Sequence, residues 1–209
     1  MAVDVQNNVY LCGEVGNIAL QLGNNLSIIE SPTFGYDGYI AKYKDIEFQD
    51  FDIDQGWNII SAYINPFDTS MTDVMADLGD TVLLMKDGLG GVYWPQYNVN
   101  QIGNWNIESG YLIKVSDITR FRLSGELVQP DSLSMVLDAG WHMISYPRYL
   151  PITVEDIFTQ YAGSIVLIKD GNGQIYWPAW AINLIGEMLP GQGYQLKVSA
   201  GFVLEYPAN

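Results

Sequence analysis

Hydrophobic residues form the same pattern twice along the chain. The stretches VLLMKDGLGGVYWP (82–95) and IVLIKDGNGQIYWP (165–178) each place four apolar residues before a Lys-Asp-Gly turn and a second apolar run before a proline. A continuous apolar run predicts a strand buried on both faces. Asp-Gly predicts a tight hairpin turn in which glycine takes a positive φ, and proline ends strand pairing because it lacks an N–H. Each stretch therefore predicts a β-hairpin.

The repeat extends well beyond the hairpins. A Gly-Trp-x-x-Ile-Ser motif begins at Gly56 and again at Gly140, and a Gly-Tyr-x-x-Lys motif begins at Gly110 and again at Gly193. Each copy predicts a first strand (57–64 and 141–146), a short helix (71–78 and 154–161) and a closing strand (111–115 and 194–198). The hydroxyls of Ser70 and Thr153 are expected to cap the two helices. The chain therefore contains two tandem copies of one module.

The region before the first copy is less regular. Short apolar runs at 9–11, 18–22 and 26–29 are separated by Asn, Gly and Ser, which is typical of strands joined by turns. Gly38-Tyr39-Ile40-Ala41-Lys42 has the form of the closing strand and predicts a third copy of it. We expect a mainly β fold with short helices, a β-rich α+β protein. Two homologous modules, 44–117 and 118–209, follow an N-terminal β cap or degenerate module at 1–43.

Charge limits the classes of partner. The 209 residues contain 24 acidic and 9 basic side chains, and the formal net charge is −15. This balance argues against nucleic acid, which needs a cationic face, and against an anionic membrane surface. The acidic stretch 45–54 predicts an edge strand with a solvated outer face rather than a metal site. No apolar run is long enough for a transmembrane helix, and the first residues do not predict a signal peptide.

Few residues offer catalytic or metal chemistry. Cys12 is the only cysteine and His142 the only histidine, so neither an intrachain disulfide nor a Cys/His zinc site can form. The recurring acids Asp73/Asp156 and Asp87/Asp170 are expected to serve helix caps and turns, and the Asp-Gly-x-Gly loops lack the ligands of an EF-hand. We expect no enzyme activity, no metal and no cofactor.

The combination of motifs resembles a known kind of module. Gly-Trp-(Asn/His)-x-Ile-Ser, Lys-Asp-Gly-x-Gly, Tyr-Trp-Pro and Pro-Gly-Gln-Gly-Tyr-Gln, over about residues 50–209, resemble tandem modules of secreted and surface proteins of Bacteroidota. The resemblance implies an accessory unit without an active site, located on an extracellular surface. A bacteriophage of such hosts that uses the module in its virion is the alternative source.

Aromatic residues are the candidates for binding. Sugars stack on aromatic rings, and the rings recur densely in both modules. Residues that recur in both copies favour core positions, whereas the non-equivalent Trp105 and Trp180 lie in loops, where recognition residues concentrate. Side chains of consecutive strand residues point to opposite faces, so at most one of Tyr93 and Trp94 joins a given surface. The candidate ligand-binding residues are Trp105, Trp180, Tyr97, Trp94 and Trp177.

Two functions fit these features. The first is a non-catalytic structural or adhesive surface component that binds protein partners or copies of itself, on a virion or an extracellular surface. The alternative is a carbohydrate-binding accessory module. An exposed aromatic surface would favour the alternative.

Overall fold

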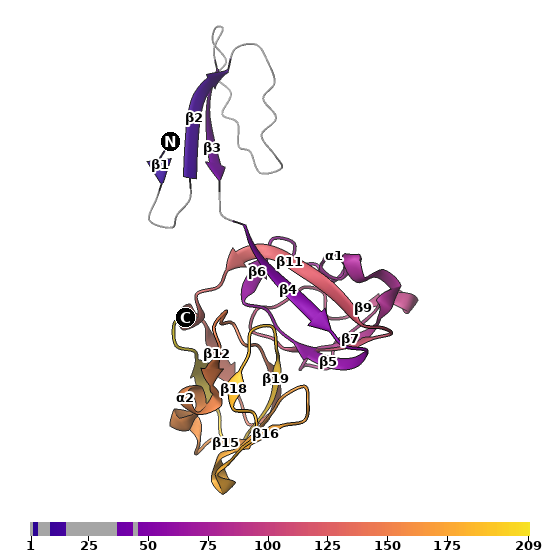
Figure 1. Ribbon diagram of the computed structural model, residues 1–209, viewed down its shortest axis with the longest axis vertical. Helices are drawn as coiled ribbons and strands as arrows, with labels where there is room; N and C mark the ends of the chain where they lie inside the picture. Colours follow the sequence, from indigo (N-terminus) through magenta and orange to yellow (C-terminus); the bar gives the residue numbers. More distant parts are fainter. Residues whose placement is uncertain (1, 4–8, 16–36, 44–45) are drawn as a thin grey trace. The chain divides into compact units, whose positions relative to one another are not determined.

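The chain folds into two compact units. The computed structural model describes residues 2–3, 9–15, 37–43 and 46–209, and it divides into a first unit, residues 1–46, and a second unit, residues 47–209. The first unit holds an antiparallel sheet of β1 (Ala2–Val3), β2 (Val9–Val15) and β3 (Asp37–Tyr43) (Figure 1). The strand predicted at 38–42 is confirmed as β3. The runs at 18–22 and 26–29 lie outside the described residues.

The first module of the second unit contains two antiparallel sheets. A five-stranded sheet has the order β5-β10-β7-β8-β9, and a three-stranded sheet has the order β4-β11-β6. In chain order the elements are β4 (Glu47–Ile53), β5 (Gly56–Ile60), β6 (Ile64–Pro66), α1 (Met71–Val74), the 3-10 helix η1 (Ala76–Thr81), β7 (Val82–Lys86), β8 (Val92–Trp94), η2 (Pro95–Tyr97), β9 (Val99–Asn100), β10 (Tyr111–Val115) and β11 (Thr119–Leu127).

The second module repeats the five-stranded sheet but not the three-stranded one. Its five-stranded sheet has the order β13-β19-β15-β16-β17, and two small sheets pair β12 with β20 and β14 with β18. After the 3-10 turn η3 (Pro130–Ser132), the elements are β12 (Ser134–Leu137), β13 (Gly140–Ile144), β14 (Ile152–Thr153), α2 (Val154–Phe158), η4 (Thr159–Tyr161), β15 (Ile165–Lys169), β16 (Ile175–Trp177), η5 (Pro178–Trp180), β17 (Ile182–Asn183), β18 (Glu187–Met188), β19 (Tyr194–Val198) and β20 (Phe202–Glu205). The predicted class, mainly β with short helices, is confirmed.

Each module has its own hydrophobic core. Strand alternation directs Tyr111, Ile113 and Val115 of β10 into the first core, and their equivalents on β19 into the second. Phe51 of β4 stacks on Phe121 of β11 with ring centroids 4.4 Å apart, so β11 belongs to the first core. The predicted limit between residues 117 and 118 is therefore too early, because the strand after it completes the sheet of the first module.

The acidic stretch has the predicted form of a solvated edge strand. On β4, Gln49, Phe51 and Ile53 are buried, while the intervening acids face solvent. Asp50 pairs with Arg122 on β11 at 2.7 Å, and hydrogen bonding to this guanidinium, together with its positive charge, lowers the pKa of the Asp50 carboxyl. Asp52 pairs in the same way with Arg120 at 2.6 Å. These acids serve cross-strand pairing.

Two predicted details of the hairpin are wrong. Lys86 pairs with Val92, so five residues rather than a tight two-residue turn connect β7 and β8, and Gly90 takes the positive φ instead of Gly88. The reason is the Asp87 carboxylate, which accepts hydrogen bonds from the backbone N–H groups of Leu89 and Gly91 at 2.9 and 2.7 Å. Asp170 holds the equivalent loop in the same way.

The apolar runs are not buried on both faces. Val82 and Met85 of β7 lie in the core, whereas Leu83 is exposed and Leu84 is half-buried. Residues of α1, η1, β4 and β11 pack against the core side of the five-stranded sheet, whereas Leu84 and Leu112 on its second face are only half-buried. Among the caps, Thr153 accepts the N–H of Asp156 as predicted, but the hydroxyl of Ser70 makes no cap hydrogen bond.

The two modules contact each other through equivalent residues. In each module, the segment just before the closing strand forms backbone hydrogen bonds with the end of the first strand of the other module. Such a reciprocal contact is isologous, like that of a twofold dimer. The hydrogen bonds are Gly110 N–H to Met143 O (3.1 Å), Gly193 N–H to Ile59 O (3.1 Å), Ser61 N–H to Gly191 O (2.9 Å) and Ser145 N–H to Glu108 O (3.2 Å). We call this set the module contact.

Candidate functional site

The open face of each five-stranded sheet carries a tryptophan beside a lysine. Trp57 on β5 lies opposite Lys114 on β10, which in turn lies opposite Leu84 on β7. Directly opposite residues in an antiparallel sheet share a face. Trp57 is 45% exposed, and the sheet therefore presents it to solvent rather than to the core.

The second module has the same arrangement. Trp141 on β13 lies opposite Lys197 on β19, and Trp141 is 52% exposed. The Lys197 ammonium lies 5.6 Å from the centre of the Trp141 ring, and the Lys114 ammonium lies 5.6 Å from that of Trp57. Cations at this range are attracted by the ring quadrupole. Each module thus exposes one tryptophan with an ammonium group held beside its ring.

A second aromatic pair follows on each module. Trp94 at the end of β8 packs edge-on against Tyr97 with ring centroids 4.6 Å apart, and Trp177 packs edge-on against Trp180 at 5.9 Å. Tyr97 and Trp180 are equivalent positions and are 60% and 70% exposed. The structure therefore brings four of the five predicted candidates together as two matching pairs.

Trp105 does not belong to this surface. It is 4% exposed and packs against Tyr111 with ring centroids 4.6 Å apart, in the first core. Its equivalent in the second module is Met188, which is also buried. The loop position of Trp105 suggested recognition, but the loop folds inward and uses the ring to fill the core. Trp105 is therefore corrected to a packing residue.

Trp57 and Trp141 were not among the predicted candidates. Their recurrence favoured a core position, as it correctly does for Tyr111 and Tyr194. The lysines give a signal that could have identified these tryptophans. Lys114 and Lys197 each lie next to core residues in the closing strands, and neighbouring strand residues point to opposite faces, so the two lysines mark the open face.

Two similar grooves open where the modules meet. One, of about 390 Å³, has Trp57 on one wall and the Lys169–Gly173 turn of the second module on the other. The second, of about 400 Å³, has Trp141 on one wall and the Lys86–Gly88 turn of the first module on the other. Leu112, Lys169 and Gln195 line both grooves. We call the two together the lysine trough.

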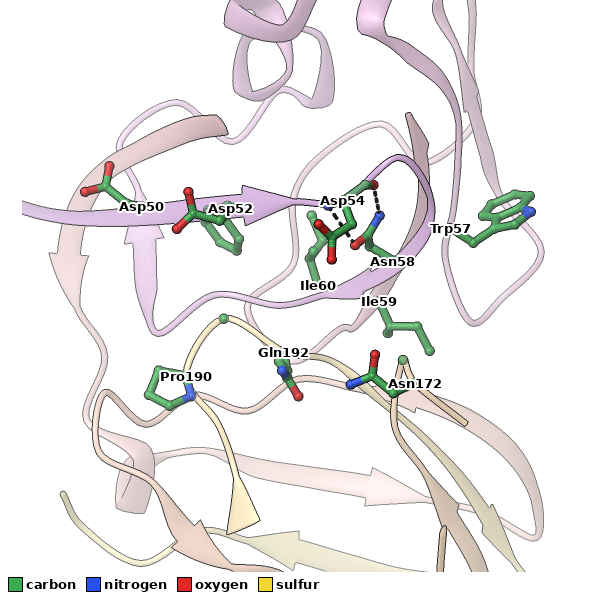
Figure 2. A pocket seen from close by; sticks show the side chains of 13 residues that line it. Asp50, Asp52, Asp54, Trp57, Asn58, Ile59, Ile60, Asn172, Pro190 and Gln192 are labelled. Carbon is green, nitrogen blue, oxygen red and sulfur yellow. Dashed lines mark hydrogen bonds between the residues drawn. The ribbon is translucent and has the colours of Figure 1, made fainter. Parts of the chain in front are cut away.

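A third groove also has Trp57 in its lining and shares Ile59, Gly171 and Asn172 with the first. It has a volume of about 420 Å³ and is lined by Asp50, Asp52 and Asp54 of the first module and by polar residues of the second. Figure 2 shows Asn172 and Gln192 of the second module opposite Asn58 and Ile59 of the first. The Asn58 amide exchanges hydrogen bonds with the backbone of Asp54 at 3.3 and 2.7 Å. Two of the acids here, Asp50 and Asp52, are already paired with arginine.

Within the described residues, no group of three or more His, Cys, Asp or Glu side chains is arranged to hold a metal ion. In that same part of the chain, no helix is long and apolar enough to cross a membrane. His142 is half-buried, and its Nε2 lies 2.8 Å from the Asp138 carbonyl oxygen.

The fold defines a tandem, mainly β protein built from two homologous modules. No protein-family model, curated protein or solved structure matches the chain. The resemblance to Bacteroidota surface modules therefore stays a prediction, and the function rests on the surface described above.

Proposed function

We propose that the protein is a non-catalytic adhesive component of an extracellular surface or a virion, and that it binds carbohydrate through its open sheet faces. The observation that carries this proposal is the recurrence of three aromatic side chains at equivalent positions of the two modules, all of them exposed except the half-buried Trp177. The first set is Trp57, Trp94 and Tyr97, and the second is Trp141, Trp177 and Trp180.

Exposure makes these rings available as platforms. Tryptophan and tyrosine combine a large apolar face with a polar edge, and they accept the apolar face of a sugar ring. Exposed aromatic clusters on a folded chain mark interaction sites. The side chains stand on strands or directly after them, so the scaffold fixes their spacing.

A non-catalytic role is supported by the recurring carboxylates. Asp87 and Asp170 each accept two backbone N–H groups in their turns, and they hold these loops in shape. Carboxylates engaged in this way serve the fold rather than general acid–base chemistry.

The test is binding of the full chain to a panel of immobilised neutral and acidic polysaccharides. We expect the wild type to bind at least one glycan, and the double variant Trp57→Ala/Trp141→Ala to lose at least tenfold in affinity, since truncation of a tryptophan that anchors an interface typically costs about 2 kcal/mol or more. Val136→Thr alters an exposed apolar residue of β12 away from these rings and serves as the control. Absence of binding to every glycan would overturn the proposal.

Assembly with protein partners or with copies of the chain is the second candidate. Leu89, at the tip of the first hairpin, is 97% exposed, and Ile118, Val136 and Leu184 are also largely exposed. Light scattering on the glycan-free protein separates the two functions. A stable oligomer that Leu89→Asp dissociates would favour assembly, whereas a monomer would favour glycan adhesion.

A further inference from the structure

We propose that the lysine trough is the ligand-binding site and that it selects a carbohydrate chain carrying carboxylate groups. This inference rests on the proposed function and adds the site and the ligand class.

Lysines are concentrated at this face. Residues 47–209 contain four lysines in all, and each stands on β7, β10, β15 or β19 of the two five-stranded sheets. Lys86 lies opposite Leu112 and Lys114 opposite Leu84, which puts both on the open face of the first sheet. Lys169 and Lys197 occupy the equivalent places in the second sheet. A chain with a net charge of −15 therefore gathers the lysines of both modules on one surface.

The ammonium groups are not neutralised by ion pairing. The ion pairs found in the part of the chain that the structure describes join Arg120 to Asp52 and Arg122 to Asp50, and none involves these four lysines. The contacts of Lys86, Lys114 and Lys197 are instead with the exposed rings. The two acids of the trough, Asp87 and Asp170, are the turn residues whose Oδ1 atoms each accept two backbone N–H groups. The trough is thus lined by two lysines, Lys86 and Lys169, and by two carboxylates that are already hydrogen-bonded. Lys114 and Lys197 add two further cations beside the tryptophans that wall it.

The two grooves form a continuous site. The Lys86 ammonium lies 5.8 Å from the centre of the Trp57 ring, while Lys86 also lines the groove walled by Trp141. Lys169 lines both grooves. A linear ligand that passes from Trp57 to Trp141 therefore meets an aromatic ring, then lysines, then a second ring. The equivalence of the two ends suits a polymer with repeating units.

This sequence of contacts matches an acidic oligosaccharide. Its pyranose faces stack on tryptophan, and its carboxylates accept charge-assisted hydrogen bonds from ammonium groups beside the ring. A nucleic acid strand also offers rings and anions, but its binding depends on a broad cationic footprint. The surrounding chain is strongly acidic. This disfavours a polyphosphate and favours a ligand that is recognised by a few local lysines.

The experiment measures affinities of the full chain by calorimetry for three probes: hexagalacturonate, a neutral galactose hexamer and a single-stranded DNA 12-mer. At 50 mM salt we expect hexagalacturonate to bind at least tenfold more tightly than the neutral hexamer. We expect this preference to shrink in 0.5 M salt, because salt screens exposed charges. Tighter binding of DNA than of hexagalacturonate would overturn the ligand class.

Variants locate the site. Lys86→Gln/Lys169→Gln removes two charges from the trough and should weaken hexagalacturonate binding about tenfold while leaving neutral-hexamer binding unchanged. Lys86→Arg/Lys169→Arg keeps the charges and should bind within about threefold of the wild type. Arg122→Gln removes a charge on β11 outside the trough and is the matched control. Hexagalacturonate binding that is unaffected by the glutamine variant would overturn the site.

Different results would overturn glycan adhesion and selectivity for acidic glycans. If neutral and acidic hexamers bind equally, glycan adhesion stands and the acidic selectivity is overturned. If no glycan binds, both are overturned. Thermal melting of each variant establishes that it is folded before its affinity is interpreted.

Discussion

Gly110 and Gly193, equivalent residues of the two modules, lie against each other at the module contact. A Cβ atom added to Gly110 would lie 2.6 Å from the Ile144 carbonyl oxygen and 3.5 Å from Gly193 Cα. A Cβ atom added to Gly193 would lie 2.8 Å from the Ile60 carbonyl oxygen and 3.3 Å from Gly110 Cα. The recurrence of glycine before the Tyr-x-x-Lys strand is therefore explained by the approach of one module to the other.

Alanine at Gly110 should open this contact. Because the obstructing atoms are backbone, the chain must shift, and we expect Gly110→Ala to cost about 1–3 kcal/mol in the free energy of unfolding. Denaturant titration measures the change. Gly163→Ala is the control, since Gly163 has ordinary φ and nothing within 4 Å of its added Cβ. Equal stability of the two variants would contradict the close packing of the modules.

Ser61 and Ser145 break the symmetry of the contact and predict opposite results. The buried Ser61 hydroxyl donates to the Gln192 carbonyl at 2.6 Å and accepts the Tyr146 N–H at 2.9 Å. Ser61→Ala removes the partner of the buried Tyr146 N–H and of the part-buried Gln192 carbonyl and should cost about 1–3 kcal/mol. The Ser145 hydroxyl is buried without a hydrogen-bond partner in the described part of the chain. Ser145→Ala should therefore be neutral or slightly stabilising in denaturant titration, and a large loss there would contradict this difference.

Alanine substitution of the buried Trp105 and of the exposed Trp180 should have very different effects on stability. Trp105→Ala empties a large volume in the first core and should cost about 3–5 kcal/mol of unfolding free energy. Trp180→Ala removes an exposed ring and should change stability by about 0.5 kcal/mol or less. Thermal and denaturant unfolding measure both effects. A stable Trp105→Ala variant would show that the ring is not a core element.

Buried tyrosines predict alkaline unfolding. Burial raises the pKa of Tyr111, Tyr194 and Tyr206 above the ordinary tyrosine value. A raised folded-state pKa means that the stabilisation is fully present below the unfolded value of about 10 and is lost as pH rises through the higher folded value. We expect the denaturation midpoint to be steady up to about pH 9 and to fall above about pH 10.

Tyr206 isolates the contribution of one buried tyrosine. The fully buried Tyr206 hydroxyl donates to the Ser145 carbonyl at 2.6 Å. Tyr206→Phe should lose about 0.5–1.5 kcal/mol at pH 7 with that hydrogen bond and should show a shallower alkaline decline than the wild type. Tyrosinate absorbance near 295 nm should rise together with unfolding. Full ionisation of the tyrosines in the folded state would contradict the prediction.

Repetition made much of the fold predictable. The hairpins, the closing strands and the helix starts recur with the same spacing, and each copy supports the assignment of the other. Prediction from the local sequence failed where a side chain, rather than the backbone, accepts the hydrogen bonds of a turn. The Asp87 carboxylate organises a five-residue turn, which the Asp-Gly dipeptide does not distinguish from a tight hairpin.

The candidate site was only partly predictable. Trp94, Tyr97, Trp177 and Trp180 were identified by their density, and they are paired on the surface. Trp105 was misassigned, and Trp57 and Trp141 were missed, because recurrence alone does not separate a core ring from a repeated surface ring. Alternation tells which residues share a face, but not which face another element will cover.

The sequence by itself determined the class of the fold, the two modules and most strand positions, since these depend on the local pattern of apolar, turn and glycine residues. Only the tertiary structure decided that the open sheet faces carry Trp57 and Trp141, that β11 completes the first core, and that the modules meet through reciprocal hydrogen bonds. The physical reason is that the burial of a side chain depends on which element packs against it. Both faces of each five-stranded sheet carry apolar residues, and only the tertiary packing decides which face is covered.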